Sequence, residues 1–455
     1  MACSESDIRA QPRAHNDHNV YILGAGFAAE AGLPLIKEFM NRMRDAAAWL
    51  EAQGGRGREV TAIERVLDFR LRAAAAAYRI PLDVENIEQL FSLASASGDP
   101  ELDDAMPLAI AATLDYALAD ERSKEKRTEE LRPFQIGVRQ PPDWQPPASW
   151  EERAQRIGDL VGRAGGLTGR LYSCSPYDFY VGVMAGFFNR GEPDRRDTIV
   201  TFNYDTVVED TLDSLRLPFS YGAERYIGWS TPSALMRAQR ARSGMRVLKL
   251  HGSINWCARE KVSAGTEEKL AAAPQSVVER MNRDVAAFPH YADVPKQKGA
   301  LVLVAPTWQK ALRRLTPVWD AAVAALRTAT NLIILGYSIP VTDQHFKYLL
   351  AAGLRDNISL RKVFFVNPAL KDERERQTLE ARLFGPSGLF RPEHREQGVI
   401  ELISADTREF FTGPHDISAG EPYRVRIGRP LNPLTYTQEN APFRFSDRQF
   451  SEAWR

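Results

Sequence analysis

The sequence predicts an α/β protein built on a Rossmann-like parallel sheet, with a large helical insertion and an extended C-terminal arm. A short apolar run, residues 20–23, ends in the glycine-rich stretch GAGF. Four more strand-like runs follow in the second half, DTIVTFNYD, RVLKLHGS, ALVLVAP and TNLIILGYS, and KVFFVNP and VIELISAD come with them. Helical patterns separate several of these runs, and short apolar strands joined by helical crossovers are typical of a parallel sheet covered on both faces.

The stretch between the first run and the others predicts helices. LPLIKEFMNRMRDAAAWL and VTAIERVLDFRLRAAAAAYRI both place apolar residues at three- and four-residue spacing. Because the first strand has to pair with strands much later in the chain, we interpret residues 40–190 as an insertion. The sheet domain then consists of residues 19–39 and 191–415. Residues 1–18, with His15 and His18, are expected to form a flexible tail, and residues 416–455 the C-terminal arm.

Composition narrows the classes of protein. Lys plus Arg and Asp plus Glu both number 59, so no basic excess indicates a nucleic-acid surface. No apolar run approaches the length that spans a bilayer, and the polar start lacks the apolar middle of a signal peptide. We therefore expect a cytoplasmic protein. The three cysteines, Cys3, Cys174 and Cys257, are far apart and predict neither a disulfide framework nor a CxxC zinc site.

Small and polar residues gather where the predicted strands end, the edge at which open α/β sheets bind ligands. Read to their ends, the strands give Gly24, Gly26, Asn203, Asp205, His251, Gly252, Ser253, Gly336, Ser338 and Asn367. Gly24 and Gly26 permit a tight turn close to a pyrophosphate, whose charge the N-terminus of a following helix would favour. Taken singly, Asn203 and Asp205 also fit helix capping, and His251 also fits a buried structural histidine.

A dinucleotide dehydrogenase fits this pattern poorly. Its fingerprint continues into a second strand with an acidic residue about 20 positions further on, which binds the ribose hydroxyl. In this sequence Asp45 falls inside a helical pattern and no strand follows. A different use of the dinucleotide is therefore favoured.

The motifs resemble those of the sirtuin family. GAGFAAEAGLP resembles its GAG-x-S-x-x-x-G-I-P motif, TFNYD its T-Q-N-I-D motif, and LHGS its catalytic H-G. GYSIPVTD and VNP are similar to the family's elements on the adenosine side, and all five occur in the family's order. The resemblance spans residues 20–405 apart from the insertion, and implies a sheet of sirtuin type that uses NAD as its substrate.

The departures from the sirtuin pattern indicate a particular branch. Sirtuin deacylases carry a zinc ribbon of paired CxxC motifs, which three isolated cysteines cannot supply. The family serine is Ala28 here, and the family's acidic-Phe-Arg is Leu35-Ile36-Lys37. With DVENIEQLFSLAS in the insertion, the chain looks more like the sirtuin-like NAD-hydrolysing proteins of bacterial antiphage defence, which deplete cellular NAD when infection is sensed.

These inferences predict an NAD+ glycohydrolase that releases nicotinamide and needs no metal. Its other product is ADP-ribose or a cyclic form, and the sequence leaves this choice open. Asn203 would orient the ribose and the attacking water, and His251 would accept a proton. By resemblance Asp205 would hold the nicotinamide carboxamide. The remaining cofactor-binding residues are expected to be Gly24, Ala25, Gly26, Phe27, Gly32, Pro34, Gly252, Gly336, Ser338 and Asn367.

Two other functions remain open from the sequence alone. One is NAD-dependent transfer of an acyl or ADP-ribosyl group to a protein, and the other is a non-catalytic NAD-sensing module. We expect a homo-oligomer, and leave open a partner protein such as an ATPase or a nucleic-acid-sensing subunit. Contact with a membrane or direct binding to nucleic acid is not expected.

Overall fold

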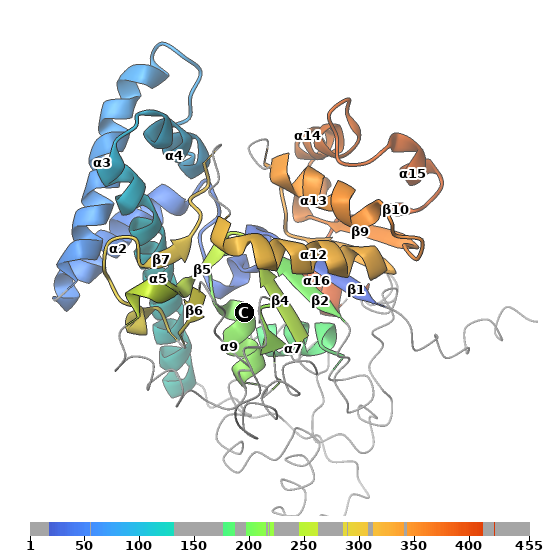
Figure 1. The fold of residues 1–455 in the computed structure, drawn as a ribbon, viewed down its shortest axis with the longest axis horizontal. Helices are drawn as coiled ribbons and strands as arrows, with labels where there is room; N and C mark the ends of the chain where they lie inside the picture. The colour runs from blue at the N-terminus through green and yellow to red at the C-terminus, as the bar shows by residue number, and fades with distance from the viewer. Residues whose placement is uncertain are drawn as a thin grey trace, which may run out of the picture.

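The computed structural model describes residues 18–54, 56–131, 176–186, 197–214, 217, 219–222, 245–262, 285–288, 290–307, 313–340, 344–412 and 423. At its centre is a seven-stranded sheet in the order β10-β9-β8-β1-β2-β4-β3, and every strand pair in it is parallel (Figure 1). The strands are β1 (Asn19–Leu23), β2 (Thr198–Thr201), β3 (Phe219–Ser220), β4 (Met245–Lys249), β8 (Asn331–Leu335), β9 (Lys362–Val366) and β10 (Ile400–Ile403). The predicted fold class is therefore confirmed.

Strand β1 occupies the middle of the sheet. It pairs with β2 on one side, where Leu23 lies opposite Thr201, and with β8 on the other, where Leu23 lies opposite Leu335. All five residues of β1 are buried, as expected for a strand covered on both faces. The strand order diverges on either side of β1, so the carboxyl ends of β1, β2 and β8 meet where open α/β folds bind ligands.

The helices from residue 176 onward pack around this sheet. Helix α12 contacts both β4 and α13, and α9 contacts α7 (Figure 1). The bounds of the helices around the sheet are α7 (Pro176–Met184), α9 (Val207–Ser214), α12 (Thr316–Thr328), α13 (Gln344–Leu354), α14 (Glu373–Phe384), α15 (Pro392–Glu396) and α16 (Thr407–Thr412). None of the helices in the described ranges is long and apolar enough to cross a membrane.

The first part of the predicted insertion forms a helical unit beside the sheet (Figure 1). It consists of α2 (Phe39–Gln53), α3 (Gly57–Ala77), α4 (Ile87–Ala96) and α5 (Pro100–Leu131). Apolar spacing explains its packing, since Met43, Ala46 and Leu50 of α2 are all buried in the core. Residues 55, 132–175 and 187–190 of the predicted insertion lie outside the described residues.

A second, antiparallel sheet separates from the main one. Its strands are β5 (Gly252–Ala258), β6 (Val285–Ala287) and β7 (Leu301–Leu303), in the order β6-β5-β7. The prediction that ALVLVAP belongs to the parallel sheet is wrong, because its strand β7 pairs antiparallel with β5 and both lie against α5. The prediction failed because an apolar run shows only that a strand is buried, and does not show which sheet the strand joins.

The predicted tail extends one residue too far. His18 is only 6% exposed, its backbone N–H donates to Thr330 Oγ1 at 2.9 Å, and its Nε2 lies 3.2 Å from Thr198 Oγ1. These contacts form because the residue lies at the amino end of β1, among polar groups of neighbouring strands. The rest of the tail, and the C-terminal arm apart from Tyr423, lie outside the described residues.

Candidate functional site

The glycine-rich loop after β1 forms two 3₁₀ turns, η1 (Ala25–Phe27) and η2 (Ala29–Ala31). Gly32 ends the second turn with φ of 73°, a left-handed conformation that suits glycine, and the buried Pro34 follows. The expectation of a helix directly after the glycines is wrong, since the first α-helix starts at Phe39. Strand β1 is therefore followed by two 3₁₀ turns and not by the N-terminus of a long helix.

The glycines of the loop interlock with the end of β8. The N–H of Gly24 donates to Leu335 O and that of Gly26 to Gly336 O, both at 2.9 Å. A Cβ on Gly24 would lie 2.6 Å from Gly336 O, and one on Gly336, whose φ is 61°, would lie 2.4 Å from Phe27 N. These glycines thus allow two strand ends to touch, and two amides that we expected to face a phosphate are bonded within the protein.

Asn203 reaches this glycine loop from the neighbouring strand. Its backbone N–H donates to Thr201 Oγ1 at 3.0 Å, and its side-chain Nδ2 donates to Gly24 O at 3.0 Å. The side chain is half-buried. The structure therefore brings the predicted Asn203 and Gly24 together, on the facing ends of β2 and β1.

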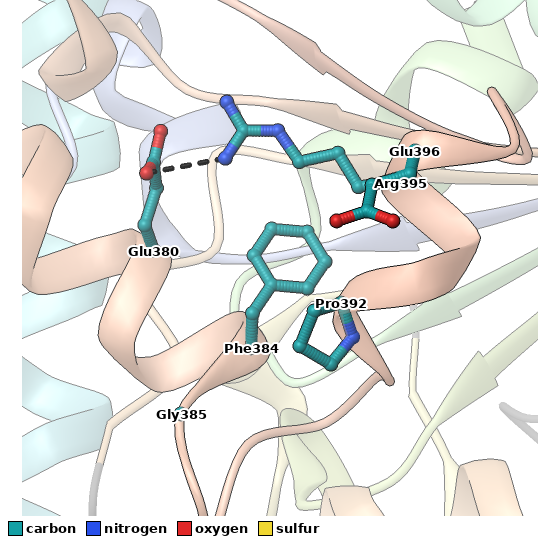
Figure 2. A pocket seen from close by; sticks show the side chains of 6 residues that line it. All are labelled: Glu380, Phe384, Gly385, Pro392, Arg395 and Glu396. Atoms are coloured by element: carbon teal, nitrogen blue, oxygen red, sulfur yellow. Dashed lines mark ion pairs between the residues drawn. The ribbon is translucent and has the colours of Figure 1, made fainter.

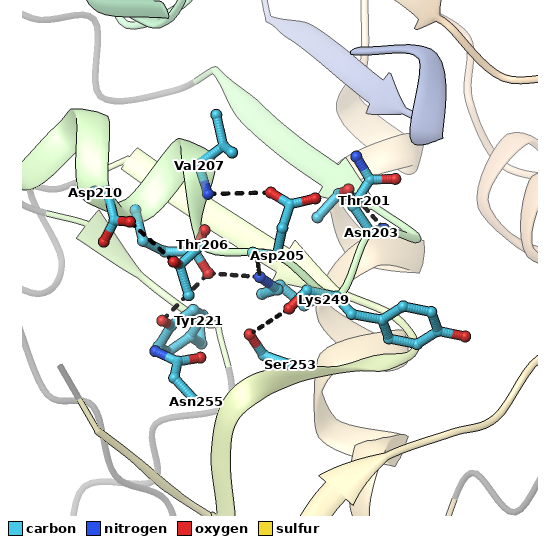
Figure 3. Close-up of polar contacts among 12 residues, drawn as sticks. Thr201, Asn203, Asp205, Thr206, Val207, Asp210, Tyr221, Lys249, Ser253 and Asn255 are labelled. Atoms are coloured by element: carbon cyan, nitrogen blue, oxygen red, sulfur yellow. Dashed lines mark hydrogen bonds and ion pairs between the residues drawn. The ribbon is translucent and has the colours of Figure 1, made fainter. Parts of the chain in front are cut away.

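His251 lies on the other side of Asn203, at the end of β4. It is 6% exposed, and its ring packs against Phe202 at 5.1 Å and Tyr204 at 6.1 Å between ring centroids. Ser253 Oγ donates to Tyr204 O at 3.1 Å, which ties the loop after β4 to the loop after β2 (Figure 3). Asn203 and His251 therefore occupy adjacent strand ends whose loops are fastened together.

Asp205 caps helix α9. Its Oδ1 accepts from Val207 N at 3.0 Å, which matches the capping interpretation, and its side chain is buried (Figure 3). Lys249 Nζ donates to the backbone carbonyl of Asp205 and pairs with Glu209 at 2.8 Å. Burial raises the pKa of Asp205 to about 6, against the opposing charge of Lys249.

Other predicted residues have contacts that are structural. Asn367 donates through Nδ2 to Tyr337 O at 3.2 Å and accepts through Oδ1 from Ala369 N at 3.0 Å, so its amide is used inside the protein. Gly252 has φ of 80°, and a Cβ there would lie 2.1 Å from Val302 O, where β5 leaves for the small sheet. By contrast Ala25 and Ser338 are exposed.

The structure adds residues that the sequence patterns did not single out. Phe202, Tyr337 and Phe346 are buried and form an aromatic group, in which Phe202 and Tyr337 stack at 5.0 Å with planes 18° apart. This group joins the end of β2, beside His251, to the end of β8. Next to it Ile339 has φ of 52°, which is strained for a β-branched residue. The aromatic residues within the FN and GY pairs, Phe202 and Tyr337, were the available signal.

An open pocket of about 640 Å³ lies elsewhere, between α14 and α15 (Figure 2). Arg395 pairs there with Glu380 at 3.2 Å and lies over the ring of Phe384. None of the predicted site residues lines this pocket, and its lining comes from helices on the β9–β10 side of the sheet. We assign the candidate site to the strand ends and not to this pocket.

No group of three or more His, Cys, Asp or Glu side chains is arranged to hold a metal within the described ranges. Cys257 is buried in the small sheet, and Cys3 and Cys174 lie outside the described residues. Burial raises the pKa of the Cys257 thiol to about 11, which keeps it protonated at neutral pH.

Comparisons with known proteins agree with the motifs in the second half of the chain. Residues 197–386 match the model of a SIR2-like domain, and no curated protein matches the chain. A sirtuin solved in a study of substrate affinity covers 94% of this chain and 98% of its own at 11% identity, with a TM-score of 0.29. Sir2Tm bound to a propionylated peptide covers 90% of this chain and 95% of its own at 12% identity, with a TM-score of 0.30. Sir2 with a p53 peptide and NAD+ covers 89% of this chain and 94% of its own at 12% identity, with a TM-score of 0.29. The similarity to a SIR2-like domain therefore extends from β2 to α14.

Proposed function

We propose that the chain is an NAD+ hydrolase that cleaves the nicotinamide–ribose bond to give nicotinamide and ADP-ribose. A SIR2-like domain supports NAD-dependent activity in general. The observation that carries the proposal is that Asn203 contacts the glycine loop while His251 lies on the adjacent strand end. Both lie beside the junction of β1 and β8, where a dinucleotide would bind.

The residues suit the chemistry of this bond. Its cleavage passes through a cationic sugar resembling an oxocarbenium ion, and the electron pair of the C–N bond leaves with nicotinamide, which departs as a neutral group. Water then adds its oxygen to the ribose carbon and loses a proton. In our proposal Asn203 orients the ribose and this water, and His251, whose ring is held between Phe202 and Tyr204, accepts the proton. Asp205 is proposed to hold the nicotinamide carboxamide.

Two substitutions test this assignment. Asn203→Ala and His251→Ala should each lower the rate of nicotinamide release from NAD by about a hundredfold to ten-thousandfold, because each removes a positioning or proton-transfer group. His394→Ala, at an exposed position on α15, is the matched control and should keep the full rate. Circular dichroism and thermal unfolding check that the variants fold. Full activity in either site variant contradicts the assignment.

The same assay separates hydrolysis from transfer to a protein. If nicotinamide appears without any added protein or peptide, water is the acceptor and the hydrolase proposal stands. If release requires an acylated peptide or a protein acceptor, the chain is a transferase. If NAD binds and no nicotinamide is released under either condition, it is a sensing module.

We further propose that this activity depletes cellular NAD as an effector of antiphage defence, in a homo-oligomer or with a partner protein. The motive is the resemblance of its motifs to those of sirtuin-like defence proteins, together with the harm that uncontrolled NAD hydrolysis would cause to its own cell. Cells expressing the wild-type chain should lose NAD after phage challenge, whereas cells expressing His251→Ala should keep it. Equal NAD levels in the two cultures would refute this role.

A further inference from the structure

The glycine-rich loop is held by two helices that lie far from it in the sequence and outside the residues that match the SIR2-like domain. These helices are α7 and α16. The hydroxyl of Tyr177, on α7, donates to Phe27 O at 2.8 Å and accepts from Ala31 N at 3.1 Å. A single side chain thus bridges the two 3₁₀ turns that form the loop.

The carboxylate of Glu30, between these two contacts, is bound on both oxygens. Tyr180 OH, also from α7, donates to its Oε2 at 2.9 Å, and Arg408 Nε, from α16, donates to its Oε1 at 2.8 Å. The ion pair is partly buried, with 26% of the Arg408 side chain and 24% of the Glu30 side chain exposed. Such a pair is less screened by water and salt than a fully exposed one.

Ring packing fixes the two tyrosines that make these bonds. Tyr177 and Tyr180 are 2% and 0% exposed. Phe27 meets the Tyr177 ring edge-on at 5.4 Å, and Tyr180 stacks on Phe411 of α16 at 5.3 Å. Burial raises the pKa of Tyr177 well above its usual value, so its hydroxyl keeps the proton that it donates to the loop.

We propose that Tyr177, Tyr180 and Arg408 are positioning residues that hold the loop of residues 25–32 in the conformation that binds the dinucleotide. The inference rests on the proposed function, since it names what sets the affinity of that site. The loop reads AGFAAEAG, and a segment rich in Gly and Ala loses much backbone freedom when it is ordered. Contacts that order it beforehand remove this cost from binding.

The expected kinetic signature separates positioning from catalysis. Asn203 and His251 lie on other strand ends, and Asn203 contacts Gly24, which precedes the loop of residues 25–32. A looser loop should therefore weaken binding of substrate and transition state alike. KM for NAD should then rise while kcat changes little. A residue that touched the reacting atoms would lower kcat instead.

Each variant removes one polar group and leaves the aromatic rings in place. Tyr177→Phe deletes the bridging hydroxyl, and Arg408→Gln deletes the ion pair with Glu30. The matched controls are Tyr116→Phe, a half-buried tyrosine that packs on Trp49, and Arg395→Gln, which breaks a more exposed ion pair with Glu380. Arg408→Lys keeps the charge and should recover part of the loss.

Two measurements on the full chain are needed beside turnover. Amide hydrogen exchange of the peptide covering residues 24–34 reports the order of the loop, and calorimetric titration with NAD reports affinity. Tyr177→Phe and Arg408→Gln should speed exchange of this peptide and raise Kd and KM by roughly fivefold to tenfold, the effect of losing one or two hydrogen bonds. The two controls should match the wild type.

The outcomes distinguish this inference from the proposed function. Unchanged exchange in both variants, or faster exchange with an unchanged Kd, overturns the inference. Absence of NAD binding by the wild-type chain overturns it as well. If NAD binds, the variants weaken binding, and no nicotinamide is released by any chain, the inference stands and the hydrolase proposal fails.

Discussion

Asp205 is a buried carboxyl group whose ionisation should be visible in the stability of the protein. Its folded-state pKa of about 6 lies above the ordinary aspartate value of 3.8, because burial disfavours the charged form. The folded state therefore holds a proton that the unfolded state loses between these values. Its contribution to stability is fully present below pH 4 and is lost as the pH rises through 6, by about 1.4 kcal/mol for each unit of pKa difference.

Asp205→Asn should remove this pH dependence. The amide Oδ1 can still accept from Val207 N, so the cap of α9 is kept while the ionisable group is gone. Urea unfolding of both chains between pH 4 and pH 7.5 should show the variant gaining stability relative to the wild type as the pH rises. Parallel stability curves for the two chains would show that Asp205 does not titrate in this window.

Lys249 is a buried cation held by two partners, and its removal should cost more than removal of the whole ion pair. The residue is 1% exposed, and its ammonium contacts Glu209 and the Asp205 carbonyl. Lys249→Met leaves the Glu209 carboxylate buried without its cation, a loss of about 3–5 kcal/mol. The double variant Lys249→Met with Glu209→Leu removes both charges and should be the more stable of the two. A double variant less stable than Lys249→Met in urea unfolding would contradict this account.

At the scale of elements, the junction of β1 and β8 depends on backbone contact between glycines. Gly336→Ala combines a positive φ with a Cβ that would lie 2.4 Å from Phe27 N. Gly299→Ala is the matched control, because its φ is 68° and nothing lies within 4 Å of the added Cβ. In both variants the positive φ of the alanine lowers the free energy of unfolding by about 1 kcal/mol. Only Gly336→Ala also has to move the ends of β1 and β8 apart.

We therefore expect Gly336→Ala to lower the melting temperature further than Gly299→Ala and to lose NAD binding, which the control should keep. Thermal unfolding and titration with NAD check the two effects. Equal melting temperatures in the two variants would mean that the ends of β1 and β8 can separate without loss of stability. The contacts between their glycines would then not be what holds the glycine-rich loop in place.

The sequence predicts helices and strands that can be recognised from the spacing of their own apolar residues. It does not predict features that depend on which distant segment an element packs against. The strands β1, β2, β4, β8, β9 and β10 were found because buried parallel strands are short apolar runs. The same kind of apolar run in ALVLVAP forms a strand of the antiparallel sheet. Apolar residues show that a strand is buried, and they do not show the direction of the strand beside it. Asn203 was predicted beside Gly24 because adjacent strand ends must meet, whereas the contact of Tyr177 with Phe27 joins residues 150 positions apart and leaves no periodic signal.

At the scale of the whole molecule, a chain of aromatic contacts runs from the C-terminal arm to the glycine loop. Tyr423 stacks on Phe410 at 6.0 Å, Phe410 meets Phe411 at 5.1 Å, and Phe411 stacks on Tyr180, whose hydroxyl holds Glu30. Stacked and edge-to-face pairs of this kind are each worth about 0.5–1.5 kcal/mol. Contacts made by the arm can therefore change the energy of the loop through α16 and α7.

From this path we predict that the proposed hydrolase is weakly active until the chain assembles. The arm is rich in aromatic residues and arginines, which protein interfaces favour, and it shows little periodicity. If arms of different chains bind one another, the rate of NAD cleavage per chain should rise with protein concentration. Truncation after Asp416 should abolish that rise and reduce the mass in solution, and Tyr423→Ala should weaken the rise while leaving the mass unchanged.

The test is NAD turnover measured across a dilution series, together with the mass of the protein in solution at each concentration. Truncation removes both the interface and the contact of Tyr423 with Phe410, whereas the single substitution removes only the contact. Comparing the truncated chain with Tyr423→Ala therefore separates the effect of assembly from the effect of the aromatic contacts that connect the arm to the glycine-rich loop. A rate per chain that is constant from the monomer upward, and equal in all three chains, would show that the arm exerts no control. Regulation would then have to act through another surface.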